Sequence, residues 1–133
     1  MLQQEKPIDY VIATGKKYTV RAFIEQAFRN CGIELEWQGK DVNEVGIIKT
    51  IASSSLNESY IHQAQLKEGQ TVLRIDPYYF RPTEVNCLIG DASKAKKNLG
   101  WTPKTTFEEL VKEMIESDLK LAYQELILKN NKL

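Results

Sequence analysis

The stretch DPYYFRPTEVNCLIGDASKAKKNLGW, residues 76–101, is the part of the sequence that most constrains the fold. A strand-like run over residues 84–90 leads directly into a lysine-rich segment, residues 92–99, that predicts a short helix. Asp91 is placed to cap this helix and Gly100 to end it. A strand that passes at once into a helix indicates a mixed α/β domain.

Upstream of this stretch the same alternation recurs. Residues 9–14 (DYVIAT) form a β-branched run that predicts a buried strand, and residues 33–38 (IELEWQ) alternate apolar and polar side chains as a half-exposed strand does. Between them, residues 19–30 place apolar side chains on one helical face, with Thr19 as the capping residue and Gly32 just past the end.

The segment from residue 39 to residue 69 shows neither a helix period nor a strand period. Its second part, residues 49–69, is polar and serine-rich, and we expect it to form an irregular insertion over the surface. A strand resumes over residues 70–76. We therefore expect residues 1–133 to form a single domain of mixed α+β class, without the roughly five or six strand–helix alternations of a complete doubly wound fold.

A long helix is predicted at the end of the chain, running to about Leu128. Thr105 and Glu108 have the spacing of a capping box at its start. The apolar side chains expected on its core-facing side are Phe107, Leu110, Val111, Met114, Leu121 and Ala122.

The composition excludes several classes of protein. Lysine plus arginine equals aspartate plus glutamate at 18 each, so no net charge attracts nucleic acid or an anionic membrane. No apolar run reaches the roughly 20 residues of a membrane span, and the N-terminus does not have the form of a secretory signal. His62, Cys31 and Cys87 are too few and too far apart for a zinc site. A cytoplasmic protein with reduced thiols is expected.

Arg81 and Glu84 are the candidate ligand-binding residues. Pro82 restricts the backbone of Arg81 to an extended conformation and so helps to aim its side chain. A planar guanidinium matches phosphate oxygens, and a carboxylate can accept two hydrogen bonds from a vicinal diol such as a ribose. The pair therefore suits one end of a nucleotide. Alternatively, the two side chains pair with each other or with neighbours as an ordinary surface ion pair.

Other residues favour structural roles. The three lysines of the short helix are expected to form a solvated face, and packing is the default for the three aromatic residues before Arg81, although they could stack on a base. His62 has no obvious catalytic partner. The sequence contains no glycine-rich dinucleotide fingerprint and no P-loop. None of its tyrosines is followed by a lysine four residues later, so a tyrosine–lysine acid/base pair is absent as well. We therefore assign no catalytic residue, metal ligand or cofactor site to this chain.

With these residues in view, the chain resembles the C-terminal part of GDP-mannose 4,6-dehydratases. The resemblance covers about residues 1–120, with a break from about Lys49 to Gln70. The segments that carry it are DYVIATG, VRAFIEQAF, GIELEWQGK and NEVGI, and then YFRPTEV followed by LIGD, KAK and LGW.

The resemblance implies an extended short-chain dehydrogenase/reductase. In complete members an N-terminal Rossmann domain holds NADP and the catalytic residues, and the smaller C-terminal part grips the GDP moiety of GDP-mannose. The product is GDP-4-keto-6-deoxymannose, on the way to GDP-fucose. The arginine and the glutamate of the FRPTEV motif then contact the pyrophosphate and the ribose, and these roles map onto Arg81 and Glu84.

Two functions follow as expectations. In the first, the chain is the GDP-binding portion of a dehydratase, inactive by itself and completed by a Rossmann half. In the second, it is a stand-alone nucleotide-sugar binding or interaction module without catalysis. Met1 resembles an internal methionine of a longer protein, so a fragment, an independently expressed portion or a gene remnant is expected. Self-association through the surface that would meet the Rossmann half is also expected.

Overall fold

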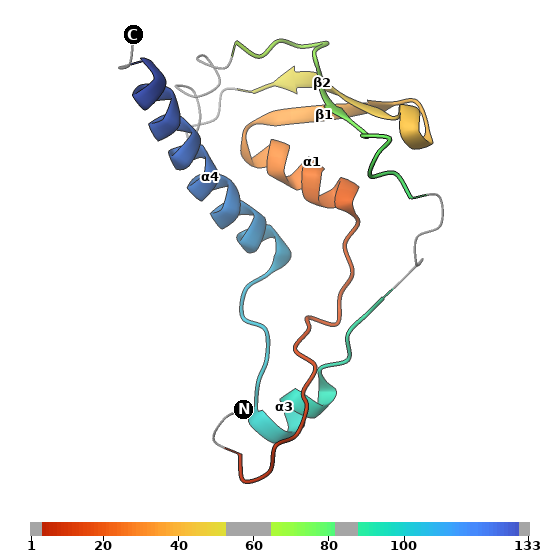
Figure 1. The fold of residues 1–133 in the computed structure, drawn as a ribbon, viewed down its shortest axis with the longest axis vertical. Coiled ribbons are helices and arrows are strands. Elements are labelled where there is room, and N and C mark those ends of the chain that lie inside the picture. Colours follow the sequence, from red (N-terminus) through yellow and green to blue (C-terminus); the bar gives the residue numbers. More distant parts are fainter. Residues whose placement is uncertain (1–3, 53–64, 82–87, 131–133) are drawn as a thin grey trace.

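The computed structural model describes residues 4–52, 65–81 and 88–130 (Figure 1). Within these ranges the chain has a mixed α/β fold, as predicted, with three helices and a three-stranded antiparallel sheet. The elements, in chain order, are α1 (Val20–Asn30), β1 (Ile33–Gln38), the 3-10 helix η1 (Asp41–Asn43), β2 (Val45–Ile51), β3 (Thr71–Arg74), α3 (Ser93–Leu99) and α4 (Phe107–Asn130).

The sheet has the order β1-β2-β3, so that β2 is its central strand. The predictions of α1 and β1 are confirmed: Thr19 accepts a hydrogen bond from the backbone N–H of Ala22, and Gly32 follows the helix with a φ of 71°. α1 packs against β1, and the buried side chains of Ile33 and Ile48 lie in the sheet beside it. This helix-on-sheet layer is the larger part of the core.

The expected irregular insertion over residues 49–69 is wrong at its beginning, because residues 49–51 are the end of β2. The sequence pattern did not predict β2, because Gly46 interrupts its run of apolar residues. A Cβ atom at this position would lie 3.0 Å from the Cβ of Leu73 and 3.5 Å from the ring of Trp37. The central strand therefore has a glycine where its neighbours on both sides approach closely. The rest of the insertion lies mostly outside the described residues.

The strand predicted over residues 9–14 is not part of the sheet. The segment is irregular, and Val11 and Ile12 are about half exposed. It lies along residues 88–94 instead, where a Cβ on Gly90 would meet the Cβ of Ala13, and Lys94 donates a hydrogen bond to the carbonyl oxygen of Asp9 at 2.8 Å. A β-branched run forms a strand only when a neighbouring strand pairs with its backbone, and the described part of this chain supplies none here.

The second predicted strand near this segment, residues 84–90, is only partly within the described residues. Residues 88–90 are irregular, and residues 84–87 lie outside the described ranges. The helix that follows is confirmed as α3. The N-cap residue is Ala92 and not the predicted Asp91, whose carboxylate accepts a hydrogen bond from the backbone N–H of Ser93 at 2.9 Å from one residue earlier. Gly100 ends the helix, as predicted, with a φ of 64°.

The capping box of α4 is formed by Thr106 and Glu109, one residue later than predicted. The backbone N–H of Thr106 donates to Glu109 Oε2 at 2.8 Å, and the N–H of Glu109 donates to Thr106 Oγ1 at 3.2 Å. Thr105 and Thr106 are each followed by a glutamate three residues on, so the spacing alone could not distinguish them. The helix continues to Asn130, two residues beyond the predicted end.

Acidification is expected to weaken this cap. Hydrogen bonds from the backbone and side chain of Thr106 hold the pKa of Glu109 below its ordinary value of 4.5. Because the folded-state pKa is the lower one, the cap contributes stability above about pH 4.5 and loses it as the pH falls through the folded-state pKa. A carboxyl-detected NMR titration should show this low pKa. Thr106→Ala removes the hydroxyl but keeps the backbone N–H, which is the larger cause, so it should return the pKa only part of the way towards 4.5. An unchanged pKa in that variant would show that the hydroxyl of Thr106 does not contribute.

A large surface remains uncovered in this fold. The buried apolar side chains among the described residues are Ala27, Ile33, Ile48, Ala95 and Val111. Sixteen large apolar side chains in the described ranges are exposed, and they are spread over the N-terminal segment, the turn after β3, residues 88–89 and α4. Leu110, Met114 and Leu121 of α4 are among them, so the expectation that these three side chains face the core is wrong.

Candidate functional site

The candidate site begins with a hydrogen-bonded turn after β3, over residues 76–79. Asp76 Oδ1 accepts a hydrogen bond from the backbone N–H of Tyr78 at 2.9 Å, and the carbonyl oxygen of Asp76 accepts one from the N–H of Tyr79 at 3.0 Å. Pro77 follows Asp76 and favours such a turn through its fixed φ. The turn therefore sets the direction in which the chain leaves the sheet towards Arg81.

The aromatic side chains in this turn are not packed in a core. Tyr78 is 85% exposed and Tyr79 is 75% exposed, while Phe80 is more covered. The two tyrosine rings contact each other edge to face, with centroids 5.0 Å apart. The expectation that the three aromatics pack is therefore wrong for Tyr78 and Tyr79. Their exposure cannot be read from the sequence, because it depends on what lies over the turn.

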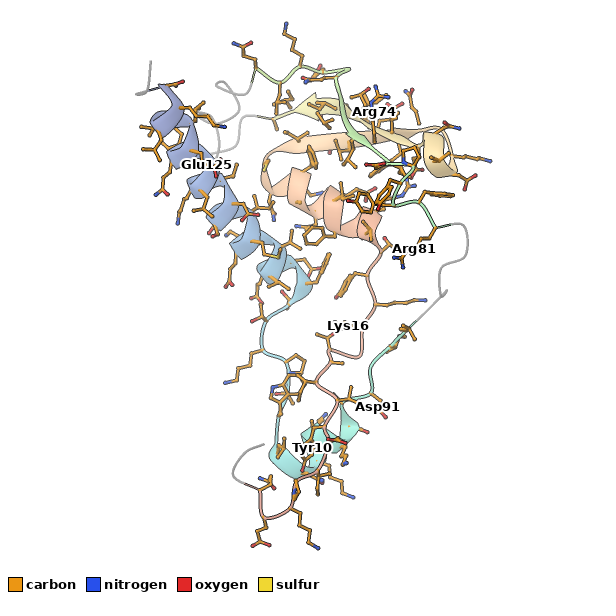
Figure 2. All side chains as sticks on the ribbon, in the orientation of Figure 1. Tyr10, Lys16, Arg74, Arg81, Asp91 and Glu125 are labelled. Carbon is orange, nitrogen blue, oxygen red and sulfur yellow. The ribbon has the colours of Figure 1, made fainter. Side chains whose placement is uncertain are left out.

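Arg81 is exposed at the end of this turn, on the opposite side of the view from α4 (Figure 2). Among the residues that the structure describes, its guanidinium has no hydrogen-bond or ion-pair partner. Glu84, the second candidate residue, lies outside the described ranges. Its arrangement with Arg81, as joint ligands or as an ion pair, stays a prediction. Arg81 itself presents the paired donors that bind phosphate oxygens bidentately.

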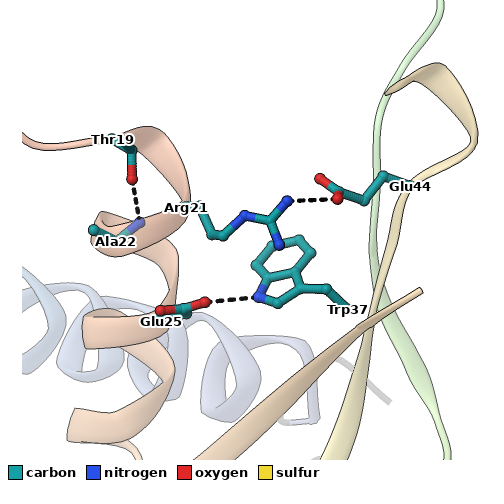
Figure 3. Close-up of polar contacts among 6 residues, drawn as sticks. All are labelled: Thr19, Arg21, Ala22, Glu25, Trp37 and Glu44. Carbon is teal, nitrogen blue, oxygen red and sulfur yellow. Dashed lines mark hydrogen bonds and ion pairs between the residues drawn. The ribbon is translucent and has the colours of Figure 1, made fainter. Parts of the chain in front are cut away.

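Arg21, at the start of α1, is a different kind of exposed arginine (Figure 3). Its guanidinium forms an ion pair with Glu44 and lies over the ring of Trp37, 4.5 Å from the ring centroid. The indole N–H of Trp37 donates in turn to Glu25 at 2.8 Å. This cluster, which the sequence analysis missed, joins α1 to β1 and to the residue before β2. The guanidinium of Arg21 is therefore held by contacts within the fold, whereas that of Arg81 has none among the described residues.

The three lysines of α3 are all exposed, as predicted for a solvated face. Lys94 in addition donates a hydrogen bond to the carbonyl oxygen of Asp9 and lies over the ring of Tyr10, 5.3 Å from its centroid. Lys94 thus holds the N-terminal segment against α3. Beside this contact is a groove of about 250 Å³, lined by residues 13–15, 90–93 and 96 and by residues 101–103. Its charged lining residues are Asp91, whose carboxylate accepts a hydrogen bond from the backbone N–H of Ser93, and Lys96, and it contains no arginine.

No group of three or more histidine, cysteine, aspartate or glutamate side chains in the described ranges could hold a metal ion, and no described helix is long and apolar enough to cross a membrane. Burial raises the pKa of the Cys31 thiol, which makes this cysteine less reactive at neutral pH. His62 and Cys87 lie outside the described ranges.

Known proteins of one family are similar in sequence to nearly the whole of this chain. Residues 1–114 match the family described as GDP-mannose 4,6 dehydratase. A GDP-mannose 4,6-dehydratase of Yersinia enterocolitica is 47% identical over 131 residues, which are 98% of this chain and 33% of the relative. One of Drosophila melanogaster is 47% identical over 121 residues, which are 91% of this chain and 26% of the relative. The chain spans about a third or less of the length of these relatives.

Proposed function

Because the chain belongs to the GDP-mannose 4,6-dehydratase family, we propose that it is the part of such an enzyme that binds the GDP moiety of GDP-mannose. The observation that carries this proposal is the exposed guanidinium of Arg81, held at the end of an ordered turn and without a partner among the described residues. Arg81 binds the diphosphate, and Glu84 binds the ribose diol. The completed enzyme dehydrates GDP-mannose to GDP-4-keto-6-deoxymannose.

The unpaired N-terminal segment supports a two-part enzyme more than a stand-alone module. Residues 8–12 carry three partly exposed β-branched side chains, and Leu88 and Ile89 of the neighbouring segment are exposed as well. An apolar strand-forming segment without a sheet is costly to leave in water, and a second domain that pairs with it removes this cost. We therefore propose that a Rossmann half covers this surface.

The residues of this chain do not fit the NADP used by complete members of the family. A dinucleotide phosphate is bound by a glycine-rich turn at the start of a helix. α1 and α4 instead begin after the threonine caps Thr19 and Thr106, with no glycine in the three residues before either cap. In our proposal NADP and the catalytic residues belong to the Rossmann half, and this chain contributes only the grip on GDP.

A ligand titration of the purified chain tests the proposal. Saturable NMR shifts are expected with GDP and GDP-mannose, in or near the residue 76–81 turn, and none with NADP. The affinity is expected on the order of 1 mM, because a half-site lacks the preorganisation and water exclusion of the complete cleft. Absence of saturable shifts with both GDP ligands would overturn the proposed site.

An activity assay separates the two-part enzyme from the stand-alone module. The chain alone is expected to show no turnover of GDP-mannose. Activity should appear when the cofactor-binding portion of a full-length relative is added as a separate polypeptide with NADP. GDP binding without such complementation would favour the module, whereas turnover by the chain alone would contradict our assignment of the catalytic residues to a partner.

A further inference from the structure

Asp76 makes two of the hydrogen bonds that order the turn after β3. Its side-chain Oδ1 accepts from the backbone N–H of Tyr78 at 2.9 Å, and its carbonyl oxygen accepts from the N–H of Tyr79 at 3.0 Å. A third bond joins the N–H of Phe80 to the carbonyl oxygen of Pro77 at 3.4 Å. Four successive residues after the strand are thus tied to one another, and Asp76 is the residue with most of the contacts.

The backbone of Arg81 is constrained from both sides as a result. On one side, the turn begins two residues after the end of β3 at Arg74 and ends at Phe80, directly before Arg81. On the other side, Pro82 disfavours all but an extended conformation of Arg81. An arginine on a backbone held in this way loses less conformational freedom when it binds phosphate oxygens than one on a mobile loop does.

The side-chain hydrogen bond is the part of this turn that depends on the identity of one residue. Backbone hydrogen bonds form with almost any sequence, whereas few side chains can accept from the N–H two residues on, chiefly those of aspartate and asparagine. The bond from Tyr78 to Asp76 Oδ1 has an ordinary hydrogen-bond length. Asp76 is therefore a position where a substitution can loosen the turn without changing Arg81 itself.

We propose that Asp76 is a positioning residue of the GDP site. It acts through the backbone, by holding the residue 76–80 turn so that Arg81 presents its guanidinium to the diphosphate. A carboxylate repels a diphosphate at close range, so a direct contact with the ligand is not the role of Asp76. This role rests on the proposed function, because GDP is the ligand for which Arg81 is positioned.

Electrostatics and positioning predict opposite results for Asp76→Ala. Removal of a negative charge near a diphosphate site would by itself tighten the binding of the anion. Removal of the acceptor for Tyr78 frees the backbone before Arg81, and this should weaken GDP binding about three- to tenfold. Asp76→Asn removes the charge but keeps a side-chain oxygen that can accept the same hydrogen bond, so it should bind GDP at least as tightly as the parent chain.

Asp91 supplies a matched control. Its Oδ1 accepts from the backbone N–H of Ser93 at 2.9 Å, which is the same contact two residues along the chain. Asp91 lies beside α3, apart from Arg81 (Figure 2). Asp91→Ala therefore removes the same kind of hydrogen bond and the same charge at a different place, and it should leave GDP affinity unchanged.

The test is an NMR titration with GDP of the full parent chain and of Asp76→Ala, Asp76→Asn and Asp91→Ala. Heteronuclear NOE values of the free chains report the order of residues 78–81, and the amide spectrum of the sheet verifies that each variant is folded. We expect Asp76→Ala alone to lose both order in the turn and GDP affinity. Asp76→Asn should keep both, which a role of the charge itself would not allow.

Three results would overturn this role of Asp76 and leave the proposed GDP site standing. They are parent-like or tighter binding by Asp76→Ala, an equal loss in Asp76→Asn, and an equal loss in Asp91→Ala. A parent chain that gives no saturable shifts with GDP overturns the proposed function and the positioning role together, so the two failures are distinguishable.

Discussion

Replacing Arg81 with alanine is expected to weaken GDP binding about ten- to a hundredfold, which takes a millimolar site beyond detection in a titration. The side chain is exposed and has no partner among the described residues, and in our proposal its donors bind the diphosphate. The variant removes a bidentate charge-assisted contact and leaves a phosphate charge without its counterpart. The measurement is the NMR titration with GDP, repeated on the variant.

Two further arginine variants make this result specific. Arg81→Lys keeps the positive charge but loses the planar pair of donors, so it should bind GDP with intermediate affinity. Arg21→Ala removes an arginine that is already held by Glu44 and Trp37, and should leave GDP affinity unchanged. Parent-like binding by Arg81→Ala would refute the phosphate role, and an equal loss in Arg21→Ala would point to a general electrostatic effect.

The elements that the sequence predicts well are those whose signals are local. α1 has a cap, one apolar face and a terminal glycine within fourteen residues, 19–32, and β1 alternates cleanly along one edge of the sheet. Each of these signals is produced by neighbours in the chain and would exist in any tertiary context. The boundaries of both elements therefore agree closely with the structure.

The errors occur where the outcome depends on distant residues. β2 contains Gly46 because Trp37 and Leu73 approach it from the two flanking strands, and neither neighbour is visible in a local window. Residues 9–14 have the composition of a buried strand, but no described strand pairs with them. The first error reflects a contact within the fold, and the second reflects a sheet that we propose lies in another domain.

In the candidate site, too, local features were predictable from the sequence and contacts between distant residues were not. Arg81 and Glu84 were selected by residue chemistry and spacing, and the structure adds that Arg81 is exposed and follows an ordered turn. The exposure of Tyr78 and Tyr79 could not be predicted, since burial is a property of the whole fold. The ion pair and cation–π contacts of Arg21 were equally hidden, because they join residues up to 23 positions apart.

Ile48→Ala is expected to destabilise the chain by about 2–5 kcal/mol, the largest effect on stability that we predict. Ile48 is 1% exposed and lies in the central strand, where its backbone N–H and C=O bind Gln70 and Gly69. Removal of its side chain leaves a cavity that the sheet cannot close without moving strands on both sides. The free energy of unfolding of a natural domain is only about 5–15 kcal/mol, so a loss of this size is a large fraction of it.

Chemical denaturation of Ile48→Ala, with Ile48→Val and Lys49→Ala as matched controls, tests this expectation. Ile48→Val removes one methyl group and should cost about 0.5–1.5 kcal/mol, and Lys49→Ala changes an exposed side chain of the same strand and should cost less than about 0.5 kcal/mol. Residues 48 and 49 lie where the sequence showed no strand period, so a graded loss would establish the sheet as the core of this chain. Equal, small losses at both positions would mean that β2 does not carry its stability and that the apolar contacts of α1 and α4 do.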